Sequence, residues 1–177
     1  MRLFIAIPLP RSFKKEIASI QQTLRKASTA GRFVPGDNFH ITLHFIGESK
    51  DLPGAVTAMQ EAVRGIRPFN LHLAGIDAFD REDGHTTMLK VAGDLDELNA
   101  LHESLESALY DQGFSRDHKR YVPHITLGRG VVCDGSVVAQ IQKTPMLSSL
   151  RAESIVLFES TREQGRMVYT PVHTQRF

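Results

Sequence analysis

Phe39-His40-Ile41-Thr42-Leu43-His44-Phe45 is the stretch that decides the fold, because its centre recurs as Pro123-His124-Ile125-Thr126-Leu127-Gly128-Arg129. The tetrapeptide His-Ile-Thr-Leu is identical in both runs, and His124 follows His40 by 84 positions. Successive side chains of a β-strand point to opposite faces, so isoleucine and leucine share one face while histidine and threonine share the other. Two such strands side by side would bring two imidazoles and two hydroxyls into one cleft.

The same offset of 84 positions relates the segments that precede the two motifs. The apolar run at residues 5–7 falls on residues 89–91, and the helical pattern at residues 13–27 falls on residues 97–111. A strand, a helix and a histidine-containing strand therefore recur in one order. This recurrence predicts two duplicated α+β lobes, and a cleft between related lobes is a natural place for a ligand.

The rest of the chain supplies further elements from its apolar spacing and its turn residues. Pro53 begins a helical pattern that ends before Pro68, and residues 69–79 and 88–91 read as strands around a turn at residues 81–85. Residues 155–159 and 167–172 read as a closing hairpin. A polar loop is expected before His40, and residues 131–150 give no clear pattern.

The composition is that of a globular protein of one domain. The chain has 177 residues, 41% hydrophobic and 23% charged, with a net charge of +1, so any nucleic acid would be held locally and not by a broad basic surface. The single Cys133 cannot form an internal disulfide, which predicts a reducing cytoplasm. The apolar run before Pro8 and Pro10 is too short for a signal peptide and reads as a strand, and no run approaches the ~20 apolar residues of a membrane span.

Two histidines that face each other suit a reaction needing a base and an acid, because imidazole titrates near neutral pH. A threonine two residues further on offers a rigid hydroxyl to an anionic oxygen. The set makes a compact site for a phosphate diester and requires no metal. A zinc site built from His40, His44 and His124 is the weaker alternative, because the threonines would then have no function.

Strand parity, the alternation of side chains between the two faces of a strand, also predicts where some other residues near the motifs lie. His44 shares a face with His40 and is expected at the rim of the cleft, whereas Phe45 shares a face with Ile41 and is expected in the core. Lys119 and Arg120 form a short basic cluster before the second motif, which can equally be a solvated face. Arg129 is favoured as a phosphate contact, although its parity is opposite to that of His124, so the strand would have to bulge or its end curl back.

The chain resembles the 2H phosphoesterases, and within them the bacterial and archaeal RNA 2′,3′-cyclic phosphodiesterases once named 2′-5′ RNA ligases. The resemblance rests on Arg2 to Ile7, on His40 to Leu43 with Phe45 and Gly47, and on Pro123 to Leu127 with Arg129. The tail is also similar, with Ser160, Gly165 and Tyr169 around its hairpin. The resemblance implies a bilobal α+β fold with two antiparallel sheets lining a central cleft, and a single 2H phosphoesterase domain over residues 1–177.

The resemblance also implies an activity: hydrolysis of a 2′,3′-cyclic phosphate at an RNA end to a 2′-phosphomonoester, without a metal or other cofactor. It makes His40 the proton donor to the leaving 3′-oxygen and His124 the base that activates water; the residues alone do not divide these roles. Thr42 and Thr126 would hold the phosphoryl oxygens with help from Arg129. RNA ends are then the partner, and we expect a cytoplasmic monomer with no membrane contact and no obligate protein partner.

Two other functions stay open from the sequence. One is a phosphodiesterase for small cyclic phosphates, such as cyclic nucleotides or ADP-ribose cyclic phosphate. The other is a non-catalytic module that binds RNA ends. Family members often carry a tryptophan or other aromatic residue in the strand before the third helix, where this chain has Met88, so the residue that stacks on the base is not identified.

Overall fold

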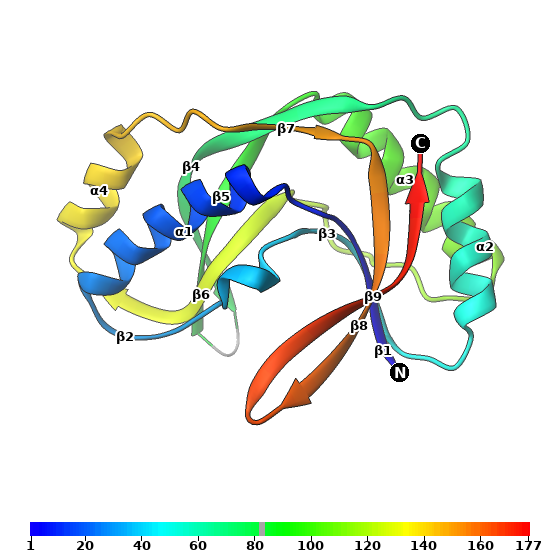
Figure 1. The fold of residues 1–177 in the computed structure, drawn as a ribbon, viewed down its shortest axis with the longest axis horizontal. Helices are drawn as coiled ribbons and strands as arrows, with labels where there is room; N and C mark the ends of the chain where they lie inside the picture. Colours follow the sequence, from blue (N-terminus) through cyan, green and yellow to red (C-terminus); the bar gives the residue numbers. More distant parts are fainter. Residues whose placement is uncertain (82–83) are drawn as a thin grey trace.

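Two antiparallel sheets form the centre of the fold in the computed structural model, which describes residues 1–81 and 84–177 (Figure 1). Sheet A has the strand order β3-β1-β8-β9, and sheet B has the order β2-β6-β5-β4-β7. The strands are β1 (Arg2–Ile7), β2 (Ser28–Phe33), β3 (Ile41–Glu48), β4 (Phe69–Arg81), β5 (Gly84–Gly93), β6 (His124–Cys133), β7 (Ser149–Ala152), β8 (Ser154–Glu163) and β9 (Arg166–Arg176). This arrangement confirms the α+β fold with two antiparallel sheets.

The helices cover the outer faces of the two sheets, two on each (Figure 1). Helices α2 (Leu52–Ala62) and α3 (Leu95–Asp111) contact strands of sheet A, whereas α1 (Arg11–Lys26) and α4 (Gly135–Lys143) contact strands of sheet B. The helical pattern expected at residues 13–27 is confirmed by α1, on which Phe13, Ile17 and Leu24 form a fully buried apolar stripe. Burial of such stripes against the sheets, more than helix propensity, stabilises helices of this length.

Strand β1 lies in the middle of sheet A, between β3 and β8. Each of its residues from Leu3 to Ile7 is buried, which is why the run reads as continuously apolar and not as alternating. The reading of this segment as a strand is therefore confirmed. No helix in the described part of the chain is long and apolar enough to cross a membrane.

Two strands and one α-helix were not predicted from the sequence. Residues 28–33, expected as a polar loop, form the edge strand β2, whose central residues are exposed and so show no alternation. The unclear region 131–150 contains α4 and the start of β7, which has only four residues. The expected turn at residues 81–85 lies partly outside the described residues, and β4 and β5 pair up to Arg81 and Gly84 on either side of it.

The offset of 84 positions holds for the observed elements. Elements β1, α1, β3, α2 and β4 correspond in order to β5, α3, β6, α4 and β8, with bounds that agree to within three residues after the shift. The last strand of each series is exchanged between the sheets, since β4 lies beside β5 in sheet B and β8 lies beside β1 in sheet A. That residues 1–177 make one domain of two pseudo-symmetric lobes stays our prediction.

Candidate active site

His40 stands immediately before β3 and is held on both ring nitrogens. Its Nδ1 donates to the carbonyl oxygen of Asn38 at 2.6 Å, and its Nε2 lies 2.8 Å from Oγ1 of Thr42. Asn38 is itself fixed, because its Nδ2 donates to the carbonyl oxygen of Met167 on β9 at 2.8 Å. The short 3₁₀ helix Gly36–Asn38 thus positions the first imidazole against the tail hairpin.

His124, the first residue of β6, repeats this local arrangement. Its Nδ1 donates to the carbonyl oxygen of Val122 at 2.7 Å, again two residues earlier in the chain. A hydrogen bond from Nδ1 to a carbonyl fixes the tautomer, so Nε2 is the nitrogen able to exchange a proton with a ligand in both rings. The two motifs are therefore alike in chemistry and geometry as well as in sequence.

The two imidazoles lie near each other across the space between the sheets. Burial lowers the pKa of His40; the bond to Asn38 opposes this, and the charges of His124 and Lys14 lower the pKa further. The Tyr121 hydroxyl, three residues before His124, donates to the carbonyl oxygen of Thr42 at 2.9 Å. The motifs expected to share one cleft are thus brought together by the fold.

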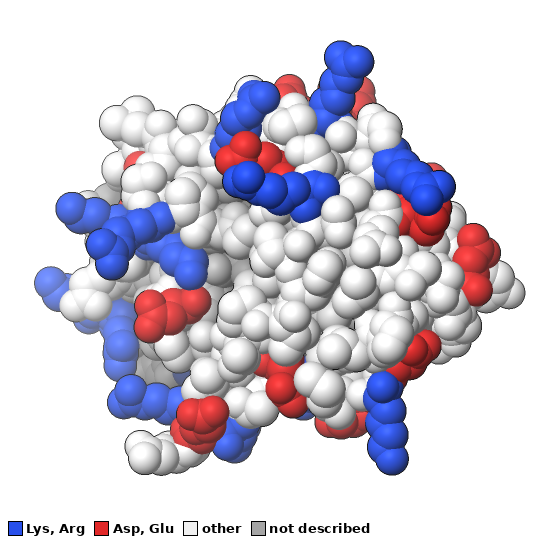
Figure 2. Space-filling model, turned by 45° about the vertical axis from the view of Figure 1, so that its right-hand side comes forward, with Lys and Arg blue, Asp and Glu red and all other residues white. Residues whose placement is uncertain are grey.

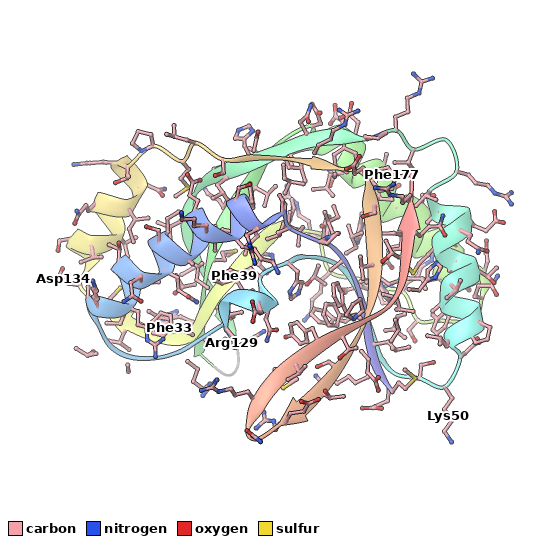
Figure 3. The ribbon with its side chains drawn as sticks, in the orientation of Figure 1. Phe33, Phe39, Lys50, Arg129, Asp134 and Phe177 are labelled. Carbon is pink, nitrogen blue, oxygen red and sulfur yellow. The ribbon has the colours of Figure 1, made fainter. Side chains whose placement is uncertain are left out.

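A bulge in β6 brings Arg129 to the same face as His124 and Thr126. Along β5, Lys90, Met88 and Thr86 alternate regularly and pair with His124, Thr126 and Arg129 in turn, with a register shift between Thr87 and Met88. Residues paired across antiparallel strands share a face, so the extra residue in β6 reverses the parity of Arg129. In Figure 3, Arg129 lies in the region between β6 and the β8–β9 hairpin. For Arg129 to contact phosphate, the sequence required either a bulge in this strand or a strand end that curls back, and the structure has the bulge.

Lys90 adds a positive charge to the sheet face that carries His124, and strand parity in the sequence did not identify it. It pairs directly with His124 across β5 and β6, and its side chain is half-buried. Met88, which pairs with Thr126 two positions further along, is fully buried and is not available for stacking on a base. The offset that placed Leu89, Lys90 and Val91 on the fourth strand was the only signal that could have found Lys90.

Phe45 does not pack in the core, contrary to the expectation from parity. Two register shifts between β1 and β3 change the facing of β3, and Phe45 pairs with Phe4 with 66% of its surface exposed. Phe4 is buried at the centre of an aromatic cluster, 5.0 Å from the ring of His40 and 4.8 Å from that of Tyr169. Phe45 therefore stands at the open side of the cluster that supports His40.

His44 does not lie at the rim of the cleft, which corrects the second expectation from parity. The same bulged pairing places it opposite Ile5 on the core face, where it is 5% exposed and its Nδ1 donates to Oε1 of Glu106 on α3. Because His44 points away from His40 and His124, these three histidines do not make one ligand set. The zinc alternative therefore lacks its third ligand.

The tail hairpin completes the surroundings of His40. The ring of Tyr169 meets that of His40 edge-on at 5.4 Å, and burial raises the pKa of Tyr169 while the charges of Arg129 and Arg2 act to lower it. A small cavity of about 70 Å³ lies here, lined by Lys14, Asn38, His40, Phe158 and Tyr169 among others. A larger hollow of about 390 Å³ lies between α2 and α3, but no histidine lines it, so the smaller cavity is the one that adjoins the candidate site.

The surface charge fits local and not general binding of an anion. Figure 2 shows Lys and Arg around the edge of the face in view, most densely at its left, with Asp and Glu among them and a wide uncharged area in the middle. Lys119 and Arg120 are exposed in the segment before β6.

Comparison with known proteins gives one consistent result. A sequence model described as the 2′-5′ RNA ligase superfamily matches residues 9–164. The RNA 2′,3′-cyclic phosphodiesterase of Thermotoga maritima is 33% identical over 131 residues, covering 73% of this chain and 70% of that protein. Its namesake in Escherichia coli is 31% identical over 173 residues, covering 97% and 93%. The crystal structure of E. coli LigT complexed with 3′-AMP matches with a TM-score of 0.77 and 27% identity over 99% of this chain and 97% of that one.

Proposed function

The chain belongs to the 2′-5′ RNA ligase superfamily, and from this premise we propose that it hydrolyses 2′,3′-cyclic phosphates at RNA ends to 2′-phosphomonoesters. The curated relatives that share the name RNA 2′,3′-cyclic phosphodiesterase support the reaction class. The E. coli LigT structure with 3′-AMP supports a nucleotide as the occupant of the cleft.

The matched anchoring of His40 and His124 is the observation that carries the proposal. In each ring Nδ1 is committed to a backbone carbonyl, so the two Nε2 atoms are the proton-transfer groups. A reaction that takes a proton from water and gives one to a leaving oxygen needs one such group for each task. The duplicated motif supplies both from equivalent positions.

The chemical step uses the chain's own residues. Nε2 of His124 takes a proton from water, the water oxygen forms a bond to phosphorus, and the bond from phosphorus to the 3′-oxygen breaks. His40 gives its Nε2 proton to that oxygen, which leaves as a hydroxyl while the phosphate stays on the 2′-oxygen. The base keeps the water proton and His40 has lost one, so a proton exchange with solvent restores the starting state. No step requires a metal.

The phosphate is held by hydroxyls and one guanidinium. Thr42 and Thr126 share the faces of their histidines and can each donate to a phosphoryl oxygen. Arg129 reaches the same face through the bulge in β6 and can offer two parallel N–H groups to an anion. Phe45, exposed beside Phe4, offers a flat apolar surface for a base.

The lowered pKa of His40 shapes its role as acid. Burial favours the neutral ring in the unliganded protein, in which Nε2 lies within hydrogen-bonding distance of the Thr42 hydroxyl. A bound phosphate anion favours the protonated ring and raises the pKa again. Substrate binding therefore takes up the proton that His40 later donates.

The test is a product assay on an oligoribonucleotide that ends in a 2′,3′-cyclic phosphate, in the presence of a chelator. We expect conversion to the 2′-phosphate, separated from the 3′-phosphate by chromatography, and loss of conversion in His124→Asn. Turnover that requires an added divalent metal would contradict the mechanism. Strong preference for a mononucleotide would favour the small-substrate alternative, and tight binding without turnover would favour the non-catalytic one.

The remaining expectations stay predictions attached to this function. We propose that residues 1–177 act as a single domain, that the protein works as a monomer in the cytoplasm, and that RNA ends are its partner. Size-exclusion chromatography with light scattering tests the monomer, since a stable dimer would double the mass of 19.8 kDa.

A further inference from the structure

Glu106 is a buried carboxylate on α3 that the reaction does not use. It is 8% exposed, and its Oε1 accepts a hydrogen bond from Nδ1 of His44 on β3. Nε2 of His102, one turn earlier on α3, lies 3.6 Å from the same oxygen. Buried carboxylates are costly unless paired, so these contacts tie α3 to β3 two residues beyond Thr42.

The same carboxylate also holds the segment that leads into the second motif. Its Oε2 accepts from the backbone N–H of Asp117 at 3.2 Å. His102 stacks on the ring of Tyr121 with centroids 4.0 Å apart and planes 4° from parallel. Residues 114–123 form neither helix nor strand, so these contacts from α3 give the segment its position.

Tyr121 joins this segment to the first motif. Its hydroxyl donates to the carbonyl oxygen of Thr42 at 2.9 Å, and the next residue, Val122, supplies the carbonyl that anchors Nδ1 of His124. Burial raises the pKa of Tyr121, so the hydroxyl stays protonated and water competes little for the bond. One hydrogen bond thus links the backbone of Thr42 to the backbone that carries the second imidazole.

We propose that Tyr121 is a positioning residue that sets the separation of His124 from His40 and Thr42, and that Glu106, His44 and His102 hold it in place. The inference rests on the proposed function, because the separation matters for an acid and a base that act on one phosphate. Displacement of a catalytic group by about 1 Å can cost about 10²-fold in rate. These four residues, Tyr121, Glu106, His44 and His102, form what we call the clamp. Phe45, which offers a surface to a nucleobase, and Arg129 are not part of it, so we expect substrate binding to change little.

The direct test is Tyr121→Phe, which keeps the ring on His102 and removes one hydroxyl. We expect kcat to fall about 10- to 100-fold while KM changes less than about threefold. Tyr110→Phe is the matched control, because Tyr110 is on α3, 58% exposed, with its ring against Arg116. Assays are run well below the thermal unfolding midpoint of each variant, so that lost stability alone does not lower kcat.

A second variant separates the clamp from general stability. Glu106→Gln keeps the shape of the side chain and removes its charge, and we expect it to lower kcat as well. Combined with Tyr121→Phe it should lower kcat little further, because groups that act through one contact are not additive. Full multiplication of the two losses would show independent roles and overturn the inference.

A measurement that does not depend on turnover distinguishes failure of this inference from failure of the proposed function. If the unmodified protein hydrolyses no cyclic phosphate, the proposed function fails, but the clamp can still be seen in the imidazole ¹H–¹⁵N signals of His40 and His124. Tyr121→Phe should shift both sets of signals, and Tyr110→Phe should shift neither. Unchanged signals in Tyr121→Phe would overturn the inference, and so would a kcat within twofold of that of the unmodified protein.

Discussion

Replacing each catalytic imidazole by asparagine tests proton transfer apart from structure. An asparagine amide can donate to the same carbonyl that Nδ1 reaches, at 2.6 Å in His40 and 2.7 Å in His124, but it has no atom that exchanges a proton at the Nε2 position. We therefore expect His40→Asn and His124→Asn to fold normally and to lose about 10²- to 10⁴-fold in kcat each. This loss corresponds to about 2.7–5.5 kcal/mol of transition-state stabilisation.

The double variant should be little worse than the poorer single variant, because an acid without its base has little left to contribute. A product of the two losses would mean that the rings act on separate steps. His72→Asn is the matched control, since His72 lies exposed on β4 and should keep full activity. The assay is single-turnover cleavage of an RNA 2′,3′-cyclic phosphate, with circular dichroism to check folding.

The pH dependence assigns the two roles. For the unmodified protein kcat/KM should be bell-shaped, and one limb should lie below pH 6.5 because burial lowers the pKa of His40 from that value. In His124→Asn only the acid remains, so the residual rate should fall as pH rises through the lowered pKa of His40. In His40→Asn only the base remains, so the residual rate should rise with pH. If instead the residual rate of His124→Asn rose with pH and that of His40→Asn fell, the two roles would be reversed. A flat profile of the unmodified protein from pH 5 to 9 would refute paired acid–base catalysis.

Three further changes probe substrate contacts. Phe45→Ala should raise KM about tenfold, because stacking of a base on an aromatic ring contributes about 1–3 kcal/mol; an unchanged KM for an RNA substrate would exclude Phe45 as the platform. Lys90→Met should weaken RNA binding and reduce the dependence of log Kd on log salt by roughly one phosphate contact, measured by fluorescence anisotropy; an unaltered slope would place Lys90 away from phosphate. Thr126→Ser should keep more activity than Thr126→Val, whose loss should be about 2- to 12-fold for one neutral hydrogen bond; equal rates would show that the hydroxyl is not used.

Much of the fold could be predicted because its strands and helices bury regular apolar patterns. The repeated tetrapeptide, with the same offset at residues 5–7 and 89–91, predicts the duplicated order of elements. The edge strand β2 could not be predicted, because an exposed strand needs no alternation. The exchange of β4 and β8 between the sheets also leaves no mark in local periodicity.

Within the site, strand parity predicted the correct face for side chains before each bulge and the wrong face for those after it. One extra residue in β6 moved Arg129 onto the face of His124, and two register shifts along β3 exposed Phe45 and buried His44. A bulge adds one residue without changing residue type, so the sequence shows little trace of it. The partner of His44, Glu106, is 62 positions away, and only the fold brings the two together.

The central place of β1 in sheet A has a consequence for how the chain folds. This strand pairs with β8, a much later element, and Leu3 lies opposite Glu159, 156 positions further along the chain. Sheet A therefore cannot close until β8 has been synthesised, and pairings so distant in sequence form slowly, on the order of milliseconds to seconds. Until then the apolar side chains of Leu3 to Ile7 are open to wrong partners, so a chain cut before Ser154 should aggregate instead of folding halfway.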